Sequence, residues 1–215
     1  MSSANRVLGC VRSILHTQRS HRPVRGKMPL KQSYAIWNNK GGVGKSTIAF
    51  HVASRYAEEH PKENVLVIDL CPQANVSMML SGGGVAGEDA VLANCMLPTP
   101  RTVVGYLSQV IASGSGAQLP NPMDFLTKVE TVNDNLTGNL YLLCGDGNLE
   151  PMAPAIAGAA SQPALTPNSD PWRWVHQIFR SLIDSAVASD SSRNWMVFVD
   201  TNPSFPSTLN LPFPR

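Results

Sequence analysis

The residues that could do chemistry are concentrated in a glycine-rich run. Asn39–Thr47 reads N-K-G-G-V-G-K-S-T, and it follows the short apolar segment Ser33–Trp37, which is typical of a buried strand. Glycines let backbone N–H groups approach phosphate oxygens closely, and the start of a helix favours anions. The run therefore predicts a loop that holds a nucleoside triphosphate, between a strand and a helix that begins at Ser46.

The residues of this loop have separate expected roles. Lys45 would reach the β- and γ-phosphates, and Ser46 would offer its hydroxyl to Mg²⁺. The strict pattern G-x-x-x-x-G-K-[ST] is not met, because Asn39 stands at its first glycine. The expected nucleotide-binding residues are Asn39, Lys40, Gly41, Gly42, Val43, Gly44, Lys45, Ser46 and Thr47.

This variant, K-G-G-x-G-K-[ST], resembles the deviant Walker A loop of the ParA/MinD family of P-loop ATPases, and its wording is similar to the ParA/Soj partitioning branch. The resemblance implies that ATP is the nucleotide, since no residue here distinguishes adenine from guanine. It implies that Lys40 reaches across a dimer interface to the partner's nucleotide, where it adds positive charge at the transferred phosphoryl group. The catalytic residues on this interpretation are Lys40, Lys45 and Asp69.

A second segment resembles switch I of the family. Asn64–Leu70 is an apolar strand containing Asp69, and Cys71–Asn75 follows it, whereas the usual text is D-x-D-P-Q-G-N. Cys71 stands at the second aspartate, which orients the attacking water in the family. A thiol is mostly neutral at pH 7 and a weak acceptor, so we expect slow or absent hydrolysis. The alternative is that Cys71 is a tolerated small hydrophobe and turnover is near normal.

A third segment resembles the Walker B and switch II text, usually D-T-P-P-S. Asn194–Val199 is an apolar strand that leads to Asp200, and Asn202 replaces the first proline. The resemblance implies that Asp200 holds Mg²⁺ through water, with Ser46 and Asp69 completing the metal residues. The expected switch residues are Cys71, Pro72, Gln73, Asp200, Asn202 and Pro203.

The remaining elements indicate what must position these motifs. Strands alternating with helices predict an α/β fold, a doubly wound and mainly parallel sheet flanked by helices. Pro151–Pro171, rich in Ala, Pro, Gly and Ser, is expected to be a surface loop, and Trp172–Val187 a helix packed on the core. The other expected elements are helices at Thr47–Glu59, Asn75–Leu80, Glu88–Met96 and Thr102–Ile111 and a parallel strand at Leu140–Cys144.

The resemblance covers about residues 31–206 of 215. In the family a helix and further strands follow switch II, so we expect residues 31–215 to be the N-terminal portion of one P-loop ATPase domain, incomplete at the C-terminus. A fragment, a truncated gene and a degenerate homologue all remain open. Family strand order then predicts that the strand before the loop has an exposed edge.

Residues 1–30 form a separate basic extension. With Lys31 they hold seven of the 17 basic residues, no acidic residue precedes Glu58, and the net charge is +2. Val7, Val11, Ile14 and Leu15 could line one face of a basic helix, as in a mitochondrial transit peptide, which is the alternative to a disordered arm on a cytoplasmic protein. A basic arm could also attract DNA or anionic lipid without specificity.

The four cysteines lack C-x-x-C spacing and the five histidines are spread out, so the sequence indicates no disulfide framework, zinc site or histidine metal site, and a reducing compartment fits. No apolar stretch is long enough to span a bilayer.

Two functions remain. One is an Mg²⁺-dependent ATPase that dimerises with ATP and acts in DNA partitioning or positioning, with non-specific DNA and a hydrolysis-stimulating protein as partners by analogy. The other is a catalytically weak nucleotide-binding or interaction protein.

Overall fold

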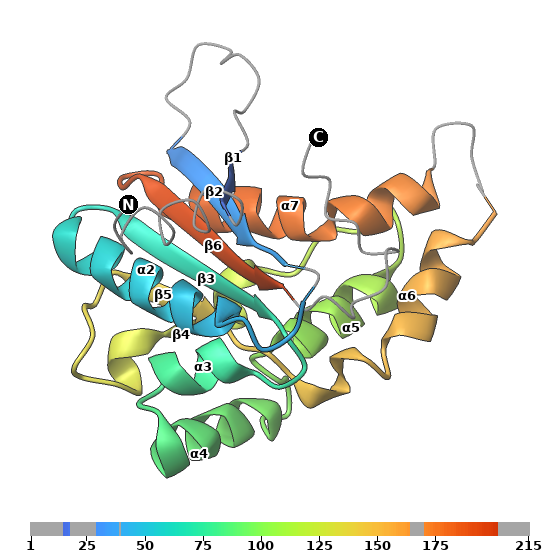
Figure 1. Cartoon of the computed structure of the whole chain (residues 1–215). Helices are drawn as coiled ribbons and strands as arrows, with labels where there is room; N and C mark the ends of the chain where they lie inside the picture. The colour runs from blue at the N-terminus through green and yellow to red at the C-terminus, as the bar shows by residue number, and fades with distance from the viewer. Residues whose placement is uncertain (1–14, 18–28, 39, 164–169, 202–215) are drawn as a thin grey trace, which may run out of the picture.

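The computed structural model describes residues 15–17, 29–38, 40–163 and 170–201. In this part of the chain the sheet has six strands in the order β1-β2-β6-β3-β5-β4 (Figure 1). The four inner strands are parallel, and the two edge strands are antiparallel to their neighbours. This confirms the predicted α/β fold. The strands are β1 (Leu15–Thr17), β2 (Leu30–Ile36), β3 (Asn64–Leu70), β4 (Thr127–Lys128), β5 (Leu140–Leu143) and β6 (Trp195–Thr201).

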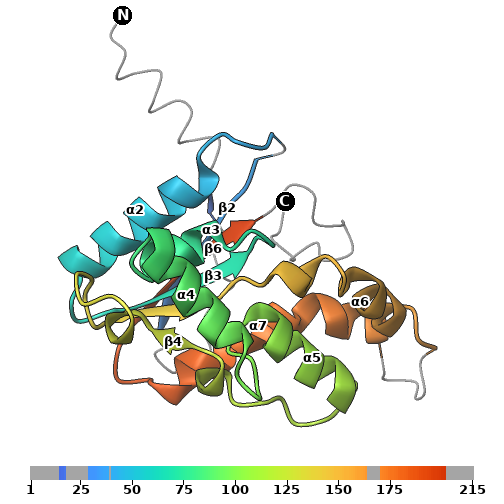
Figure 2. The same cartoon turned by 90° about the horizontal axis from the view of Figure 1, so that it is seen from below.

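Helices cover both faces of the sheet, as Figure 2 shows from below. One apolar cluster joins α2 and α3 to one face, and a second joins α5, α6 and α7 to the other. Strand β3 is buried along its whole length, which explains its apolar run Val65–Ile68. Each such buried side chain contributes roughly 1.5–3 kcal/mol. The helices are α2 (Lys45–Glu59), α3 (Asn75–Leu80), α4 (Gly84–Cys95), α5 (Val103–Ser113), α6 (Ala153–Ala160) and α7 (Pro171–Ser189), with short 3-10 turns at Pro122–Asp124, Val129–Thr131 and Gly147–Leu149.

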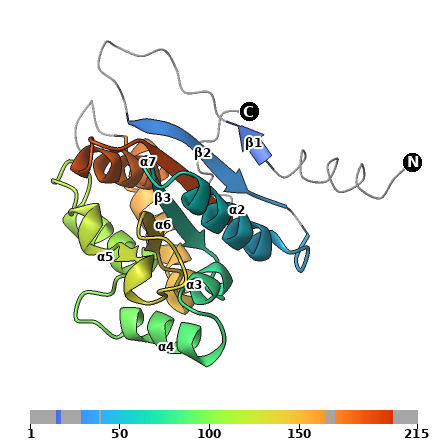
Figure 3. The same cartoon turned by 90° about the vertical axis from the view of Figure 1, so that its left-hand side faces the viewer.

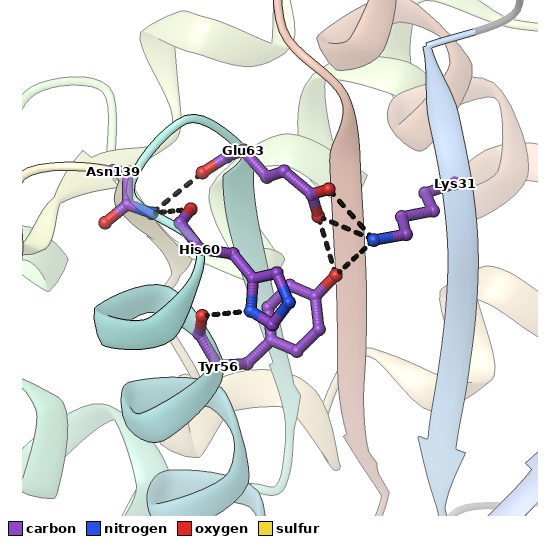
Figure 4. A network of polar contacts seen from close by, with 5 residues as sticks. All are labelled: Lys31, Tyr56, His60, Glu63 and Asn139. Atoms are coloured by element: carbon purple, nitrogen blue, oxygen red, sulfur yellow. Dashed lines mark hydrogen bonds and ion pairs between the residues drawn. The ribbon is translucent and has the colours of Figure 1, made fainter.

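The end of α2 is held to the sheet by a polar network far from the glycine loop (Figure 4). Lys31 Nζ, on β2, donates to Glu63 Oε1 at 2.9 Å and to the Tyr56 hydroxyl at 3.0 Å, and that hydroxyl donates to Glu63 Oε2 at 2.6 Å. These two hydrogen bonds raise the pKa of Lys31 to about 12. Asn139 Nδ2 donates to the carbonyl oxygens of His60 and Glu63. The network ties the C-terminal end of α2 to β2 and to Asn139, the residue before β5.

The prediction that the strand before the glycine loop, β2, has an exposed edge is wrong. Leu15–Thr17 pairs antiparallel with Tyr34–Ile36, so β1 covers the end of β2 that leads into the glycine loop (Figure 3). The prediction considered only parallel neighbours, whereas a short segment from the N-terminal extension can satisfy the same backbone groups. Leu15 is therefore in a strand and not in the proposed basic helix. Val7, Val11 and Ile14 lie outside the described residues.

The prediction of a loop over Pro151–Pro171 is wrong for its first half. Ala153–Ala160 is helix α6, which packs against α7 through buried Ile156 and Ala159. Composition misled here, because alanine favours helix and a proline in the first turn costs nothing. Residues 164–169 lie outside the described part of the chain. The prediction for α7 is confirmed, with its apolar side buried in the core.

Helix α4 lies beside α3 at the periphery of the molecule and buries only Gly87 and Asn94 (Figure 1). In the part of the chain that the structure describes, no helix combines the length and apolar character that a membrane span needs.

Candidate functional site

The glycine loop connects β2 to α2 at the carboxyl end of the parallel strands. Gly42 and Gly44 have φ of +69° and +83°, values that other residues rarely adopt, and Gly44 is the N-cap of α2. Lys45 is only 8% exposed, and its Nζ donates to the Lys40 carbonyl oxygen at 3.3 Å. The Lys40 N–H donates to Asn38 Oδ1 at 2.9 Å, and the Lys40 side chain is exposed. The first turn of α2 thus brings a buried ammonium group close to the N-terminal N–H groups of the helix, which have no partner within a helix.

Asp69 is fully buried at the end of β3 and is fixed by three hydrogen bonds. Its Oδ1 accepts from the Cys71 N–H at 2.9 Å, and its Oδ2 accepts from the N–H and hydroxyl of Ser77 at 3.1 and 2.7 Å. Ser77 Oγ also accepts from the Gly145 N–H at 2.9 Å. A Cβ at Gly145 would lie 2.9 Å from Asp69 Cγ, so the contact requires glycine. The network joins the ends of β3 and β5 to the switch I turn and α3.

Asp200 lies directly beside Asp69, because β6 and β3 are paired in register there. It is fully buried, and neither carboxylate oxygen accepts a hydrogen bond from any residue that the structure describes. Such an uncompensated carboxylate is costly unless a cation approaches it. With the Ser46 hydroxyl nearby on α2, these oxygen donors fit Mg²⁺, which prefers carboxylates, hydroxyls and phosphates.

The electrostatics of the site reflect closely packed negative groups. Burial and the adjacent charge of Asp200 raise the pKa of Asp69 to about 7, although its three hydrogen bonds oppose the shift. Burial also raises the pKa of Asp200, although the nearby side chains of Ser46 and Cys71 and the positive charge of Lys45 act to lower it. The Cys71 pKa is raised well above its usual value, first by burial and then by the two carboxylates. Without a metal ion, Cys71 is therefore a neutral thiol.

An open pocket of about 820 Å³ covers this edge of the sheet. Most of the predicted nucleotide-binding residues line it, together with Cys71 and Gln73 from switch I. Residues from α3 and α4 also line it, and sequence reasoning missed them because they belong to no recognisable motif. The lining residues are Gly41, Gly42, Val43, Gly44, Lys45, Ser46, Thr47, Cys71, Gln73, Asn75, Met78, Met79, Gly83, Gly84 and Glu88.

The structure therefore brings together the described residues of all three predicted motifs. Asp69, Cys71 and Asp200 offer ligand atoms within 4.8 Å of one another. Pro72 lies in the switch I turn between Cys71 and the pocket residue Gln73. Three predicted residues lie outside the described part of the chain, namely Asn39, Asn202 and Pro203.

The switch I turn contains a strained residue that gives a stability prediction. Ala74 has φ of +51° at the N-cap of α3, where the D-x-D-P-Q-G-N text has glycine. We expect Ala74→Gly to raise the free energy of unfolding by about 0.5–1 kcal/mol in urea denaturation, because glycine adopts this conformation without strain. The matched variant Ala93→Gly, in the exposed part of α4, should lower it by about 1 kcal/mol. A loss of stability in Ala74→Gly would mean that packing of the methyl group outweighs the strain.

Comparison with known proteins agrees with this geometry. The family described as AAA domain matches residues 31–136. A maintenance of carboxysome distribution protein A from Gloeobacter kilaueensis is 32% identical over 120 residues, which are 46% of this chain and 54% of that protein. The chain thus spans about half the length of this relative.

Solved structures show the same fold at low identity. Apo McdA from Cyanothece has a TM-score of 0.51 and 16% identity, covering 82% of this chain and 52% of its own. Cobyrinic acid a,c-diamide synthase from Mycobacterium smegmatis, with bound ADP and magnesium, has a TM-score of 0.51 and 19% identity, covering 82% and 53%. The loop, the two buried aspartates and the sequence match to the carboxysome distribution protein support the resemblance to the ParA/MinD family of P-loop ATPases, and the solved structures show that the fold is shared.

Proposed function

We propose that this protein binds ATP with Mg²⁺ in the pocket between the glycine loop and switch I, and that it works as a nucleotide-dependent positioning or partitioning protein. The observation that carries the proposal is that the buried Lys45 ammonium group and the Asp200 carboxylate, which has no hydrogen-bond partner among the described residues, lie at the same end of the sheet. A triphosphate needs the first and its cation needs the second.

The residues would divide the work as follows. The N–H groups of Gly41–Gly44 and the Lys45 ammonium group would hold the phosphates, and Ser46, Asp69 and Asp200 would hold Mg²⁺ directly or through water. Bound Mg²⁺ would neutralise charge on the phosphates. Asp69 is oriented in advance by Ser77, so nucleotide binding would require no rearrangement of β3.

The relatives motivate the rest of the proposal. In the ATP state two copies would close face to face, with the exposed Lys40 of each reaching the partner's nucleotide. The dimer would bind DNA without sequence specificity. A partner protein would stimulate hydrolysis and so release the dimer from DNA. A location in the cytoplasm accords with such a tether.

A second candidate is a nucleotide-binding protein without useful hydrolysis. It is favoured by Cys71, because a buried neutral thiol at the position of the family's water-orienting aspartate is a poor hydrogen-bond acceptor. The two candidates share the binding site and differ only in turnover.

Binding of a fluorescent ATP analogue to the full chain, followed by fluorescence anisotropy, tests the proposal. We expect saturable binding that EDTA weakens and that unlabelled ATP reverses better than GTP. Phosphate release measured on the same sample separates the two candidates. A folded sample that binds neither nucleotide would refute both.

A further inference from the structure

The three groups that meet at the carboxyl ends of β3 and β6 include a sulfur atom. Asp69, Cys71 and Asp200 are all buried, and one ligand atom from each lies within 4.8 Å of the other two. Magnesium gains nothing from a thiolate, since it prefers oxygen. Zinc is bound by cysteine sulfur and by carboxylate oxygen and takes tetrahedral sites with three protein ligands and one open position.

The surroundings of the three groups supply what a bound cation needs. Asp200 is fully buried, and neither of its oxygens has a hydrogen-bond donor among the described residues. Asp69 is held by the Cys71 and Ser77 N–H groups and the Ser77 hydroxyl, which leaves lone pairs on both oxygens. Hydrogen bonds of this kind orient a metal ligand before the metal arrives.

Distance and charge are also suitable. Tetrahedral zinc with bonds of about 2.3 Å to sulfur and 2.0–2.2 Å to oxygen places its ligand atoms roughly 3.5 Å apart, so these atoms need to approach by no more than about 1.3 Å. Cys71 begins the turn after β3, so its side chain can make this adjustment without breaking the sheet. Two carboxylates and a thiolate carry three negative charges, which a divalent cation and the buried Lys45 ammonium group balance.

We propose that Asp69, Cys71 and Asp200 form a binding site for a thiophilic divalent cation, zinc, in the nucleotide-free protein. Zinc would bind with loss of the thiol proton, and its fourth position would face the phosphate pocket. Only the consequence of this binding rests on the proposed function: zinc would occupy the place of Mg²⁺ and tie switch I to β6, so that Mg²⁺–ATP binds poorly until zinc is removed.

The test measures zinc binding to the metal-stripped full chain without nucleotide, by competition with a chromogenic chelator. We expect one zinc per chain, not displaced by excess Mg²⁺, and an affinity at least roughly tenfold lower in Cys71→Ser. The matched control replaces two other thiols, Cys10→Ser with Cys95→Ser, and should bind zinc as the wild type does. Equal affinity in the wild type and Cys71→Ser, or loss of binding in the control, would overturn the proposal.

Cobalt gives a second readout that reports the ligand itself. Co²⁺ bound to a thiolate absorbs in the near ultraviolet by charge transfer. We expect this absorption in the wild type and its absence in Cys71→Asp, which keeps an oxygen ligand in place should Cys71→Ser fail to fold. A wild-type Co²⁺ complex without this absorption would refute sulfur ligation.

The two proposals fail separately in one further variant. Lys45→Ala should lose ATP binding and still bind zinc through Cys71, with a lower affinity, since Lys45 balances charge at the site but is not a ligand. Zinc binding through Cys71 in a protein that never binds ATP would support the metal site and refute the proposed function. ATP binding by a protein that does not bind zinc would support the proposed function and refute the metal site.

Discussion

Replacing Lys45 by alanine is expected to weaken Mg²⁺–ATP binding by roughly 100-fold or more, because the proposed charge-assisted hydrogen bonds from its ammonium group to two phosphates would be lost. The ammonium group is nearly buried, so water in the space that it leaves would be a poor substitute for its charge. The Lys40 carbonyl oxygen that now accepts its hydrogen bond cannot supply a positive charge either. Fluorescence anisotropy with a labelled ATP analogue measures the change.

Two lysine controls make this result specific. Lys62→Ala removes an exposed lysine from the turn between α2 and β3, at the opposite end of the sheet, and should leave binding unchanged. Lys40→Ala should leave binding by a single chain nearly intact and reduce nucleotide-dependent dimerisation, seen by light scattering. A Lys45→Ala protein that still binds with wild-type affinity would show that the loop does not hold the triphosphate.

Restoring the carboxylate of switch I is expected to have a comparable effect on turnover. We expect Cys71→Asp to raise the rate of phosphate release by about 100-fold, the size of effect that a well-placed proton acceptor supplies. The raised pKa keeps the native thiol neutral, so it polarises an attacking water weakly. Phosphate release at saturating Mg²⁺ and ATP measures the rate.

The isosteric variant Cys71→Asn is the matched control, because it has the shape of aspartate without its charge. It should hydrolyse as slowly as the wild type. Cys71→Asp adds a third carboxylate next to Asp69 and Asp200, so its melting temperature without Mg²⁺ should fall. Equal rates in Cys71→Asp and the wild type would show that the thiol does not limit hydrolysis. Either another group positions the water, or hydrolysis is limited by something other than residue 71.

The sequence predicted most of the fold because its strands and loop motifs are local signals. Asn64–Leu70 is predicted and observed with the same bounds, since the apolar run Val65–Ile68 is local to this segment and all seven positions are buried. The glycine loop is similar, because Gly42 and Gly44 occupy backbone conformations that depend on their own residue type. The order of the motifs then implied a parallel sheet, which the structure confirms.

Elements that depend on tertiary packing were missed or predicted wrongly. Helix α6 forms from a composition that also suits loops, and its contact with α7 decides between them. Strands β1 and β4 are too short to leave a periodic pattern and exist because a neighbouring strand has free backbone groups. The polar network of Ser77 and Gly145 likewise joins segments far apart in the chain.

By itself, the sequence predicted the kind of chemistry, since a glycine loop with Lys45 and Ser46 at the start of a helix is typical of a phosphate site. It also identified Cys71 as a departure, because Asp69, Pro72, Gln73 and Asn75 around it match the switch I text. Only the tertiary structure decided that Asp69, Cys71 and Asp200 are one cluster, because residues 131 positions apart meet through the in-register pairing of β3 and β6. Burial then raised their pKa values and left Asp200 without a described partner, and neither property can be read from residue spacing.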